Sequence, residues 1–249
     1  SMQQVAELKG EPSASTSKES LGHTDDVNSV AFDPSGKYLA SGSNDCTVRI
    51  WDVSTQQQVA VLRGNKVASH ANYMNSVAFD PSGKYLASGS RDETVRMWDV
   101  RTWREVAMLR DKNFGHTGRV TSVAFHPSGK YLASGCGDSI FGNTVRVWDV
   151  SSMQQVAELK GHTSEVRCIA FDPRGKYLAS CSRDEVWIWH VVFPSAPALD
   201  ELQADDDGNG YDMAMKGPEI MPLLPIKDRK SQGPGQGGRR SRKRNNRNK

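Results

Sequence analysis

One block of residues recurs along the chain and limits its possible folds more than any other feature. The sequence NSVAFDPSGKYLASGS occupies residues 28–43 and again, without a change, residues 75–90. It returns as TSVAFHPSGKYLASGC at residues 121–136 and as RCIAFDPRGKYLASCS at residues 167–182. The phenylalanines of successive copies are 46 or 47 residues apart. A period of this length predicts four similar supersecondary units that stack side by side.

Each copy of the block predicts short strands joined by turns. Val-Ala-Phe suits a strand, and the Asp-Pro-Ser-Gly-Lys after it suits a turn, because proline presets φ and glycine can adopt a positive φ. Tyr-Leu-Ala-Ser predicts the next strand and Val-Arg-x-Trp a third, while segments such as residues 58–62 predict a fourth. Strands of this kind suit a sandwich, a barrel or a propeller, and the period of 46–47 residues selects an all-β propeller.

The four copies lead to RIWDV, RMWDV, RVWDV and WIWHV, and in this they resemble the WD-repeat (Trp-Asp repeat) β-propeller family over residues 22–192. The resemblance implies four blades of four antiparallel strands within residues 22–194. The expected blade boundaries are approximately 22–63, 64–110, 111–160 and 161–194. Residues 1–21 are expected to hold the outer strand of a preceding blade and a polar insert. Residues 195–249 are expected to form a disordered tail that is first acidic and then strongly basic.

The resemblance also implies a hydrogen-bonded set of His, Ser, Asp and Trp inside each blade. By position these structural tetrads are His23, Ser41, Asp45 and Trp51; His70, Ser88, Asp92 and Trp98; His116, Ser134, Asp138 and Trp148; and His162, Ser180, Asp184 and Trp189. A Ser-His-Asp set also suggests a hydrolase triad, but a triad needs one exposed nucleophile with an oxyanion hole. The set recurs four times, each time with a tryptophan that would cap the hydrogen-bonded chain, and this favours a structural role instead.

The fourth repeat departs from the pattern in two ways. It ends in Trp189-His190 where the others have Trp-Asp, and Asp184 is five positions before Trp189 where the first two repeats have six. We therefore expect a tighter inner turn and an imperfect network in this blade.

A partner-binding face follows from the resemblance as well. In similar propellers, contacts cluster at the third and fifth residues after the tetrad His and at the residue before the tetrad Asp. The corresponding residues are Asp26, Asn28, Asn44, Tyr73, Asn75, Arg91, Arg119, Thr121, Glu165, Arg167 and Arg183. Four arginines against two acids predict an acidic or phosphorylated protein segment as ligand, with Tyr73 as an aromatic anchor. A rim that is merely solvated is the alternative.

The number of blades leaves three arrangements open. The family usually closes rings of about seven blades, and an open half-ring would expose apolar faces. Residues 1–10, SMQQVAELKG, are identical to residues 152–161. The chain could be part of a longer propeller, a half-ring that self-associates, or a four-bladed ring in which residues 1–10 supply the last outer strand.

Charge is concentrated at the end of the sequence. Residues 227–249 contain ten Lys or Arg and one Asp, a net charge of +9, which leaves −6 on the preceding residues. The cluster Arg239, Arg240, Arg242, Lys243 and Arg244 suits a nuclear-import signal or sequence-independent contact with RNA or DNA phosphates. The segment DDDGNG at residues 205–210 resembles half of a calcium loop, but Lys216 stands where that loop needs a glutamate.

The remaining features exclude other classes of function. The cysteines show no metal-ligand spacing, which predicts reduced thiols in a reducing compartment. No apolar run approaches the ~20 residues of a membrane span. No nucleotide loop or unrepeated polar cluster is visible. The sequence thus predicts a scaffold for protein–protein interactions, without enzymatic activity, cofactor or metal, in the nucleus or cytoplasm. The basic tail favours the nucleus, and its alternative function is RNA processing or ribosome assembly.

Overall fold

The computed structural model describes residues 22–63, 72–109, 118–137, 142–192 and 219–226, together with Leu8 and His116. All helices and strands assigned within these ranges are β-strands, with no helix among them. The strands are β1 (Val27–Phe32), β2 (Tyr38–Ser43), β3 (Val48–Asp52), β4 (Gln57–Leu62), β5 (Met74–Phe79), β6 (Tyr85–Ser90), β7 (Val95–Asp99), β8 (Arg104–Leu109), β9 (Arg119–Phe125), β10 (Tyr131–Gly137), β11 (Thr144–Asp149), β12 (Gln154–Lys160), β13 (Cys168–Phe171), β14 (Tyr177–Cys181), β15 (Val186–Val192) and β16 (Glu219–Ile226).

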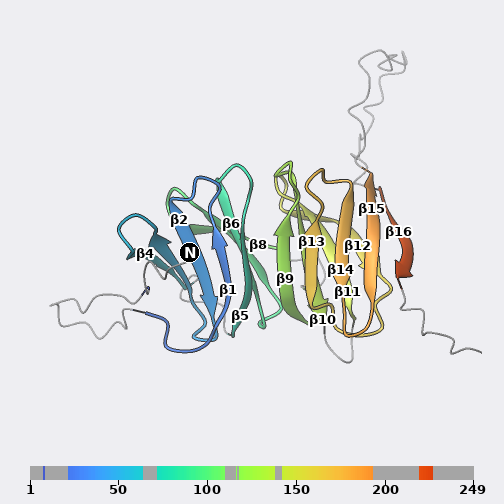
Figure 1. Ribbon diagram of the computed structural model, residues 1–249, viewed down its shortest axis with the longest axis horizontal. Helices are drawn as coiled ribbons and strands as arrows, with labels where there is room; N and C mark the ends of the chain where they lie inside the picture. The colour runs from blue at the N-terminus through green and yellow to red at the C-terminus, as the bar shows by residue number, and fades with distance from the viewer. Residues whose placement is uncertain are drawn as a thin grey trace, which may run out of the picture.

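The strands form four antiparallel sheets, each of four strands in chain order. Blade 1 contains β1 to β4, blade 2 contains β5 to β8, blade 3 contains β9 to β12, and blade 4 contains β13 to β16. Figure 1 shows the blades side by side, with blade 1 at the left end and blade 4 at the right end. The prediction of an all-β fold built from four propeller blades is confirmed.

The turn between the first two strands of a blade follows directly from its sequence. In blade 1, the Asp33 carboxylate accepts hydrogen bonds from the Ser35 hydroxyl at 2.5 Å and from the Tyr38 amide at 2.6 Å. Gly36 adopts a φ of 72°, which a residue with a side chain rarely does. The equivalent turn of blade 2 has the same bonds at Asp80. The turn therefore fixes the register of the hairpin.

The hydrophobic core lies between the blades. One cluster joins Val48 and Ile50 of blade 1 to Met74 and Val77 of blade 2. A second cluster lies between blades 2 and 3, and a third between blades 3 and 4. Since each sheet buries its apolar residues against a neighbour, a blade depends on the next blade for its stability.

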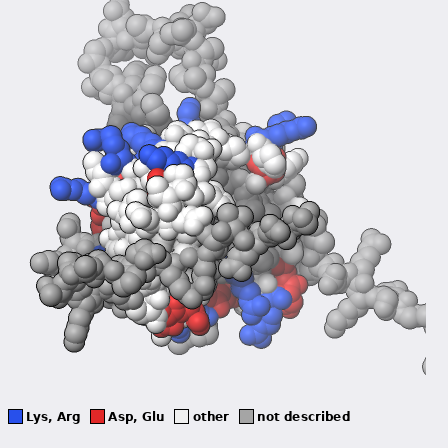
Figure 2. All heavy atoms as spheres, turned by 60° about the vertical axis from the view of Figure 1, so that its left-hand side comes forward, with Lys and Arg blue, Asp and Glu red and all other residues white. Residues whose placement is uncertain are grey.

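The stack of blades is open at its two ends. The inner strands pack in series, β1 on β5, β5 on β9 and β9 on β13, and β1 has no comparable packing on β13. Val30 and Phe32 on β1 are 61% and 63% exposed. Figure 2 shows this end of the stack, where a broad uncharged surface lies between charged side chains at its upper and lower margins. The arrangement is not the self-closed four-bladed ring that the sequence left open.

The outer strand of blade 4 corrects another expectation. β16 pairs with β15 in antiparallel register, from Val186 opposite Ile226 to Val192 opposite Glu219. The strand therefore comes from the segment 195–249, which we expected to be disordered, and not from residues 1–10. The reason is local composition, because EIMPLLPI is an apolar stretch within a polar tail. In the part of the chain with described coordinates, no helix is long and apolar enough to span a membrane.

Candidate functional site

A chain of hydrogen bonds links the four tetrad residues of blade 1. Asp45 can only accept, so Nδ1 of His23 donates to its Oδ2 at 2.8 Å. Nε2 of His23 then accepts from the Ser41 hydroxyl at 2.7 Å. The same hydroxyl oxygen accepts from the indole Nε1 of Trp51 at 2.8 Å. The network joins the segment before β1 to β2, to the β2–β3 turn and to β3.

The same bonds recur in the other blades as far as the described residues extend. The indole of each tetrad tryptophan donates to the tetrad serine at 2.8–2.9 Å in all four blades. His116 and His162 lie 2.7 Å from the hydroxyls of Ser134 and Ser180. His70 of blade 2 and Asp138 of blade 3 lie outside the described residues.

Blade 4 departs from the predicted tetrad in its acidic residue. Asp184 is exposed, and the carboxylate beside His162 belongs to Glu185, whose Oε2 lies 3.5 Å from Nδ1. Glu185 also accepts hydrogen bonds from the amide and the hydroxyl of Thr163. The assignment of Asp184 to the tetrad was wrong.

The length of the inner turn explains the exchange. In blade 1 the Ser43 amide bonds to the Thr47 carbonyl across a turn of three residues, whereas in blade 4 the Ser182 amide bonds to the Glu185 carbonyl across two. Glu185 thus takes the position of Thr47 at the start of the third strand. Its carboxylate lies 3.5 Å from Nδ1 of His162, without the hydrogen bond that Asp45 accepts from His23, so the network of this blade is imperfect, as expected.

A threonine completes the network, and the tetrad pattern missed it. Thr47 donates its hydroxyl at 2.6 Å and its amide at 3.0 Å to Oδ1 of Asp45. Thr94 makes the same two bonds to Asp92 in blade 2. The sequence signal was available, because a threonine follows the tetrad aspartate by two positions in both blades.

Burial and hydrogen bonding fix the charge state of the network. Burial pushes the pKa of Asp45 upward, but hydrogen bonds from Thr47 and His23 outweigh it and hold the pKa below its ordinary value. Burial, with a smaller contribution from Arg146, lowers the pKa of His116 to about 3. The aspartate is therefore ionised and His116 neutral at pH 7. Ser41 and Ser134 are 4% and 0% exposed, so a substrate cannot reach their hydroxyls.

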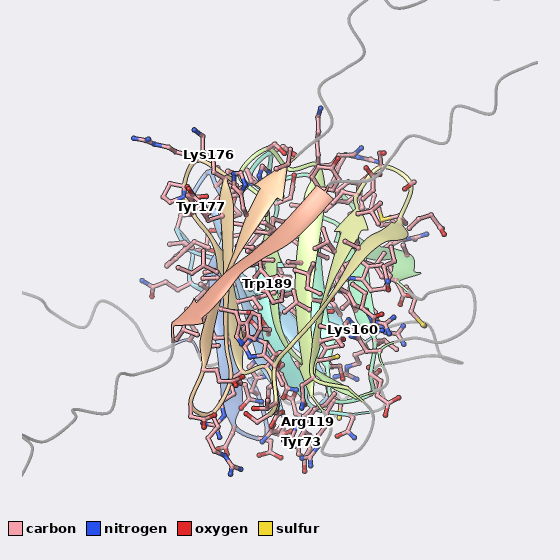
Figure 3. All side chains as sticks on the ribbon, turned by 90° about the vertical axis from the view of Figure 1, so that its right-hand side faces the viewer. Tyr73, Arg119, Lys160, Lys176, Tyr177 and Trp189 are labelled. Atoms are coloured by element: carbon pink, nitrogen blue, oxygen red, sulfur yellow. The ribbon has the colours of Figure 1, made fainter. Side chains whose placement is uncertain are left out.

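A pocket lies at one rim of the stack, where strand ends and loops from all four blades converge. Its volume is about 300 Å³. The residues that line it are Asn28, Asn75, Arg91, Arg119, Thr121, Glu165 and Arg167. All of them belong to the partner face predicted from the sequence. Figure 3 shows Tyr73 and Arg119 at this rim, and Lys176 and Tyr177 at the opposite rim.

The other residues of the predicted face adjoin the pocket. The side-chain oxygen of Asn44 accepts a hydrogen bond from the side-chain amide of Asn28 at 2.7 Å. The backbone amide of Asn44 donates to the Asp26 carbonyl at 2.9 Å. The guanidinium of Arg91 lies over the ring of Tyr73, 5.6 Å from its centroid. The structure therefore brings these predicted residues together at one rim of the stack. Arg183, the last of them, contacts the same loop region through its amide, which donates to Ser164 at 3.2 Å.

The residues that line the pocket carry a net positive charge. Arg119 donates two hydrogen bonds of 2.5 Å to the carboxylate of Glu165, so each neutralises the other. Gly137 permits this contact, because a Cβ there would lie 2.7 Å from the Glu165 Cα. Among the described residues, no carboxylate pairs with Arg91 or Arg167, both of which are exposed. Two guanidinium groups therefore remain available at the mouth of the pocket.

The described residues contain no group of three or more His, Cys, Asp or Glu side chains that could hold a metal ion. The calcium-like segment 205–210, the basic cluster 239–244 and residues 1–7 lie outside the described ranges.

Short stretches of this chain are similar to ribosome biogenesis proteins. The BOP1 homolog of Drosophila virilis is 48% identical over 46 residues, which are 18% of this chain and 6% of that protein. The BOP1 homolog of Aedes aegypti is 49% identical over 41 residues, which are 16% of this chain and 5% of that protein. The matched stretch thus spans only a small part of the length of these relatives.

The comparison with protein families extends much further along the chain. The model of the WD domain, G-beta repeat, matches residues 15–52, 57–99, 109–149 and 153–190. These segments cover more than half of the sequence and contain the inner three strands of each blade, apart from the last two residues of β15. The four sheets, the repeated His-Ser-Trp bonds and this match agree. The chain belongs to the WD-repeat family.

Proposed function

We propose that this chain is a non-enzymatic scaffold that binds an acidic or phosphorylated segment of a partner protein in the arginine-lined pocket. WD-repeat proteins are in general protein-interaction scaffolds. The observation that carries the finer proposal is the pair of exposed guanidinium groups, on Arg91 and Arg167, beside a pocket of about 300 Å³. That volume suits one anionic side chain and its neighbours rather than a large ligand.

The polar groups of the pocket favour a phosphorylated ligand over a simple hydrophobic one. Guanidinium groups bind phosphate and carboxylate through paired N–H donors. The side-chain amides of Asn28 and Asn75 are already engaged with the Met74 and Val120 carbonyls. They hold the pocket wall in place, so the arginines supply the charge that a ligand would meet.

A peptide library tests this proposal. The probe is a set of peptides with phosphoserine at a fixed position and mixed residues around it, compared with the same set carrying serine. We expect the natural chain to retain the phosphorylated set and a variant with Arg91→Ala and Arg167→Ala to lose it.

The matched control carries Arg101→Ala and Arg174→Ala, which remove the same charge from the opposite rim of the stack. Arg101 lies beside Val100, whose amide bonds to Lys84, and Arg174 lies in the turn before Lys176. Equal retention of both peptide sets by all three proteins would show that this pocket does not recognise anionic segments.

A second function deserves a test because of the tail and the relatives. The similar proteins are named for ribosome biogenesis. Residues 227–249 of this chain carry a net charge of +9, which suits RNA phosphates. The alternative is therefore a nucleic-acid-associated factor of the nucleus, in which the tail supplies affinity and the blades supply protein contacts.

A further inference from the structure

Each of the first three blades has a serine on its first strand directly opposite a glycine on its second strand. We call these two residues the facing pair of the blade. They are Ser29 and Gly42 in blade 1, Ser76 and Gly89 in blade 2, and Ser122 and Gly135 in blade 3.

The two members of a facing pair lie on the same face of their sheet, because both meet one residue of the next blade. In blade 1 the Ser29 hydroxyl accepts a hydrogen bond from the Val77 amide at 3.1 Å. A Cβ on Gly42 would lie 3.2 Å from Cγ1 of the same Val77. The facing pairs of blades 2 and 3 make the equivalent contacts.

Blade 4 has a cysteine at both positions of its facing pair. Cys168 on β13 is paired with Cys181 on β14. Both thiols are free, with Cys168 exposed and Cys181 partly exposed. Blade 4 is the last blade at the right-hand end of the stack in Figure 1. Two thiols therefore stand on an accessible face at positions that neighbouring blades cover elsewhere.

The register of the two strands suits a bond between these thiols. Directly opposite residues of antiparallel strands have Cα atoms about 4.5–5.5 Å apart. Disulfides form when the two Cα atoms are about 4.4–6.8 Å apart and the side chains lie on the same side. Cys168 and Cys181 meet both conditions, so a disulfide can close without a rearrangement of the β13–β14 hairpin.

The other two cysteines lie in different surroundings. Cys136 is buried and lies opposite Val120 in the β9–β10 register. Cys46 lies in the β2–β3 turn, where its thiol is 3.6 Å from the Asn44 carbonyl. They serve as internal controls, because neither has a cysteine opposite it in the described sheets.

We propose that Cys168 and Cys181 form a redox-active dithiol, which a low-molecular-weight disulfide oxidises reversibly to a cross-strand disulfide. Cys168 is the more exposed thiol, so its thiolate attacks one sulfur of the small disulfide and releases the first small thiolate. The Cys181 thiolate then attacks the Cys168 sulfur of this mixed disulfide and releases the second. The two electrons pass to the small disulfide, which becomes two small thiols, and these take up the two protons that the cysteines lose.

Equilibration with glutathione tests the proposal. The fully reduced natural chain is mixed with oxidised and reduced glutathione in several ratios, and the remaining thiols are then blocked with iodoacetamide. Trypsin releases Cys168 within residues 168–174 and Cys181 within residues 177–183. Mass spectrometry of the digest therefore measures the fraction of chains in which these two peptides are linked.

We expect the linked fraction to rise with oxidised glutathione as a single two-electron equilibrium and to vanish when dithiothreitol is added. No linked peptide should contain Cys46 or Cys136. The variant Cys181→Ser should stop at the mixed disulfide, with one glutathione on Cys168. The variant Cys168→Ser should take up glutathione about tenfold more slowly, because Cys181 is less exposed.

The matched control keeps two thiols on the same face but moves one of them along β14. It carries Cys181→Ser and Ala179→Cys, which places the second thiol opposite Ala170. The Cα atoms of such a diagonal pair are about 7–8 Å apart, so we expect a linked fraction at least about tenfold lower at the same glutathione ratio.

A second control is available if near-ultraviolet circular dichroism shows that the first does not fold. It carries Cys181→Ser and Val186→Cys. Val186 is 43% exposed and lies opposite Cys181 on β15, so its thiol would be two strands, about 9–10 Å, from β13.

Three results would overturn the proposal. The natural chain could collect one glutathione on each cysteine without forming the linked peptide. The folded control could form the linked peptide as readily as the natural chain, which would mean that the register does not direct the bond. Cys168 could fail to react in a folded natural chain, which would mean that this face of blade 4 is covered in solution.

Discussion

The carboxylate of Glu185 lies beside the imidazole of His162, with 3.5 Å between Oε2 and Nδ1. It takes the part that Asp45 has beside His23 in blade 1, although the sequence pattern favoured Asp184. Glu185→Ala should therefore lower the free energy of unfolding by about 1–3 kcal/mol, because the Thr163 amide and hydroxyl lose their acceptor and the buried His162 loses the carboxylate beside it. Asp184→Ala should change it by less than about 0.5 kcal/mol. Urea unfolding of the two variants makes the comparison, and a larger loss for Asp184→Ala would restore the original assignment.

Two valines in identical sequence surroundings provide a second test. Val30 and Val77 occupy the same position in the repeated block, but Val30 is 61% exposed and Val77 is 5% exposed. Val77→Ala should lower the free energy of unfolding by about 2 kcal/mol, because it leaves a cavity between blades 1 and 2. Val30→Ala should cost less than about 0.5 kcal/mol. Equal costs in thermal or urea unfolding would mean that blade 1 is covered in solution.

Stability should fall as the solution becomes acidic. Burial lowers the pKa of His116 to about 3, and burial also lowers the pKa of His162 against the opposing effect of Glu185. A histidine with a lowered pKa binds fewer protons in the folded chain than in the unfolded chain. Its contribution is complete above the ordinary pKa of about 6.5 and is lost progressively below it.

The free energy of unfolding should therefore decrease between about pH 7.5 and about pH 5, by up to about 1.4 kcal/mol per pH unit for each such histidine. The lowered pKa values of Asp45 and Glu185 act in the same direction at lower pH. Urea unfolding at several pH values gives the slope. The variant His116→Asn should show a smaller slope than the natural chain, and an unchanged slope would count against a neutral, buried His116.

The basic tail leads to a prediction about salt. If residues 227–249 bind RNA phosphates, the affinity for single-stranded poly(U) should fall steeply with salt concentration. Deleting the tail should reduce the slope of log K against log salt by about 0.7 for each phosphate contact removed. Replacing Arg239, Arg240, Arg242, Lys243 and Arg244 by glutamine serves as the milder variant. Identical slopes for natural and deleted chains would remove the support for the nucleic-acid alternative.

The repeated block made the blades predictable because its information is local. Turn residues such as Asp33 and Gly36 specify their hairpin without help from distant segments, and the four copies predicted the four blades of the described residues. The position of a residue within the repeat also predicted where the pocket lies, since the same offset from the tetrad histidine brings Asn28 and Asn75 to the same rim of the stack.

What the sequence could not provide is the set of contacts between segments. Val30 and Val77 have the same two residues before them and the same thirteen after them, and the packing of blades is what distinguishes them. The exchange of Asp184 for Glu185 depends on a turn shortened by one residue, and its outcome follows from geometry. β16 lies within a polar tail whose average composition concealed eight apolar-rich residues, Glu219–Ile226.

The most direct test of the account is the affinity of one phosphopeptide selected by the natural chain. Isothermal titration should compare it with its serine counterpart, on the natural chain and on the Arg91→Ala, Arg167→Ala variant. We expect the phosphate to strengthen binding to the natural chain by about tenfold or more, and to have little effect on the variant, because guanidinium groups bind phosphate through charge-assisted hydrogen bonds. A phosphate effect of equal size on both proteins would contradict the assignment of this pocket as the site for anionic protein segments.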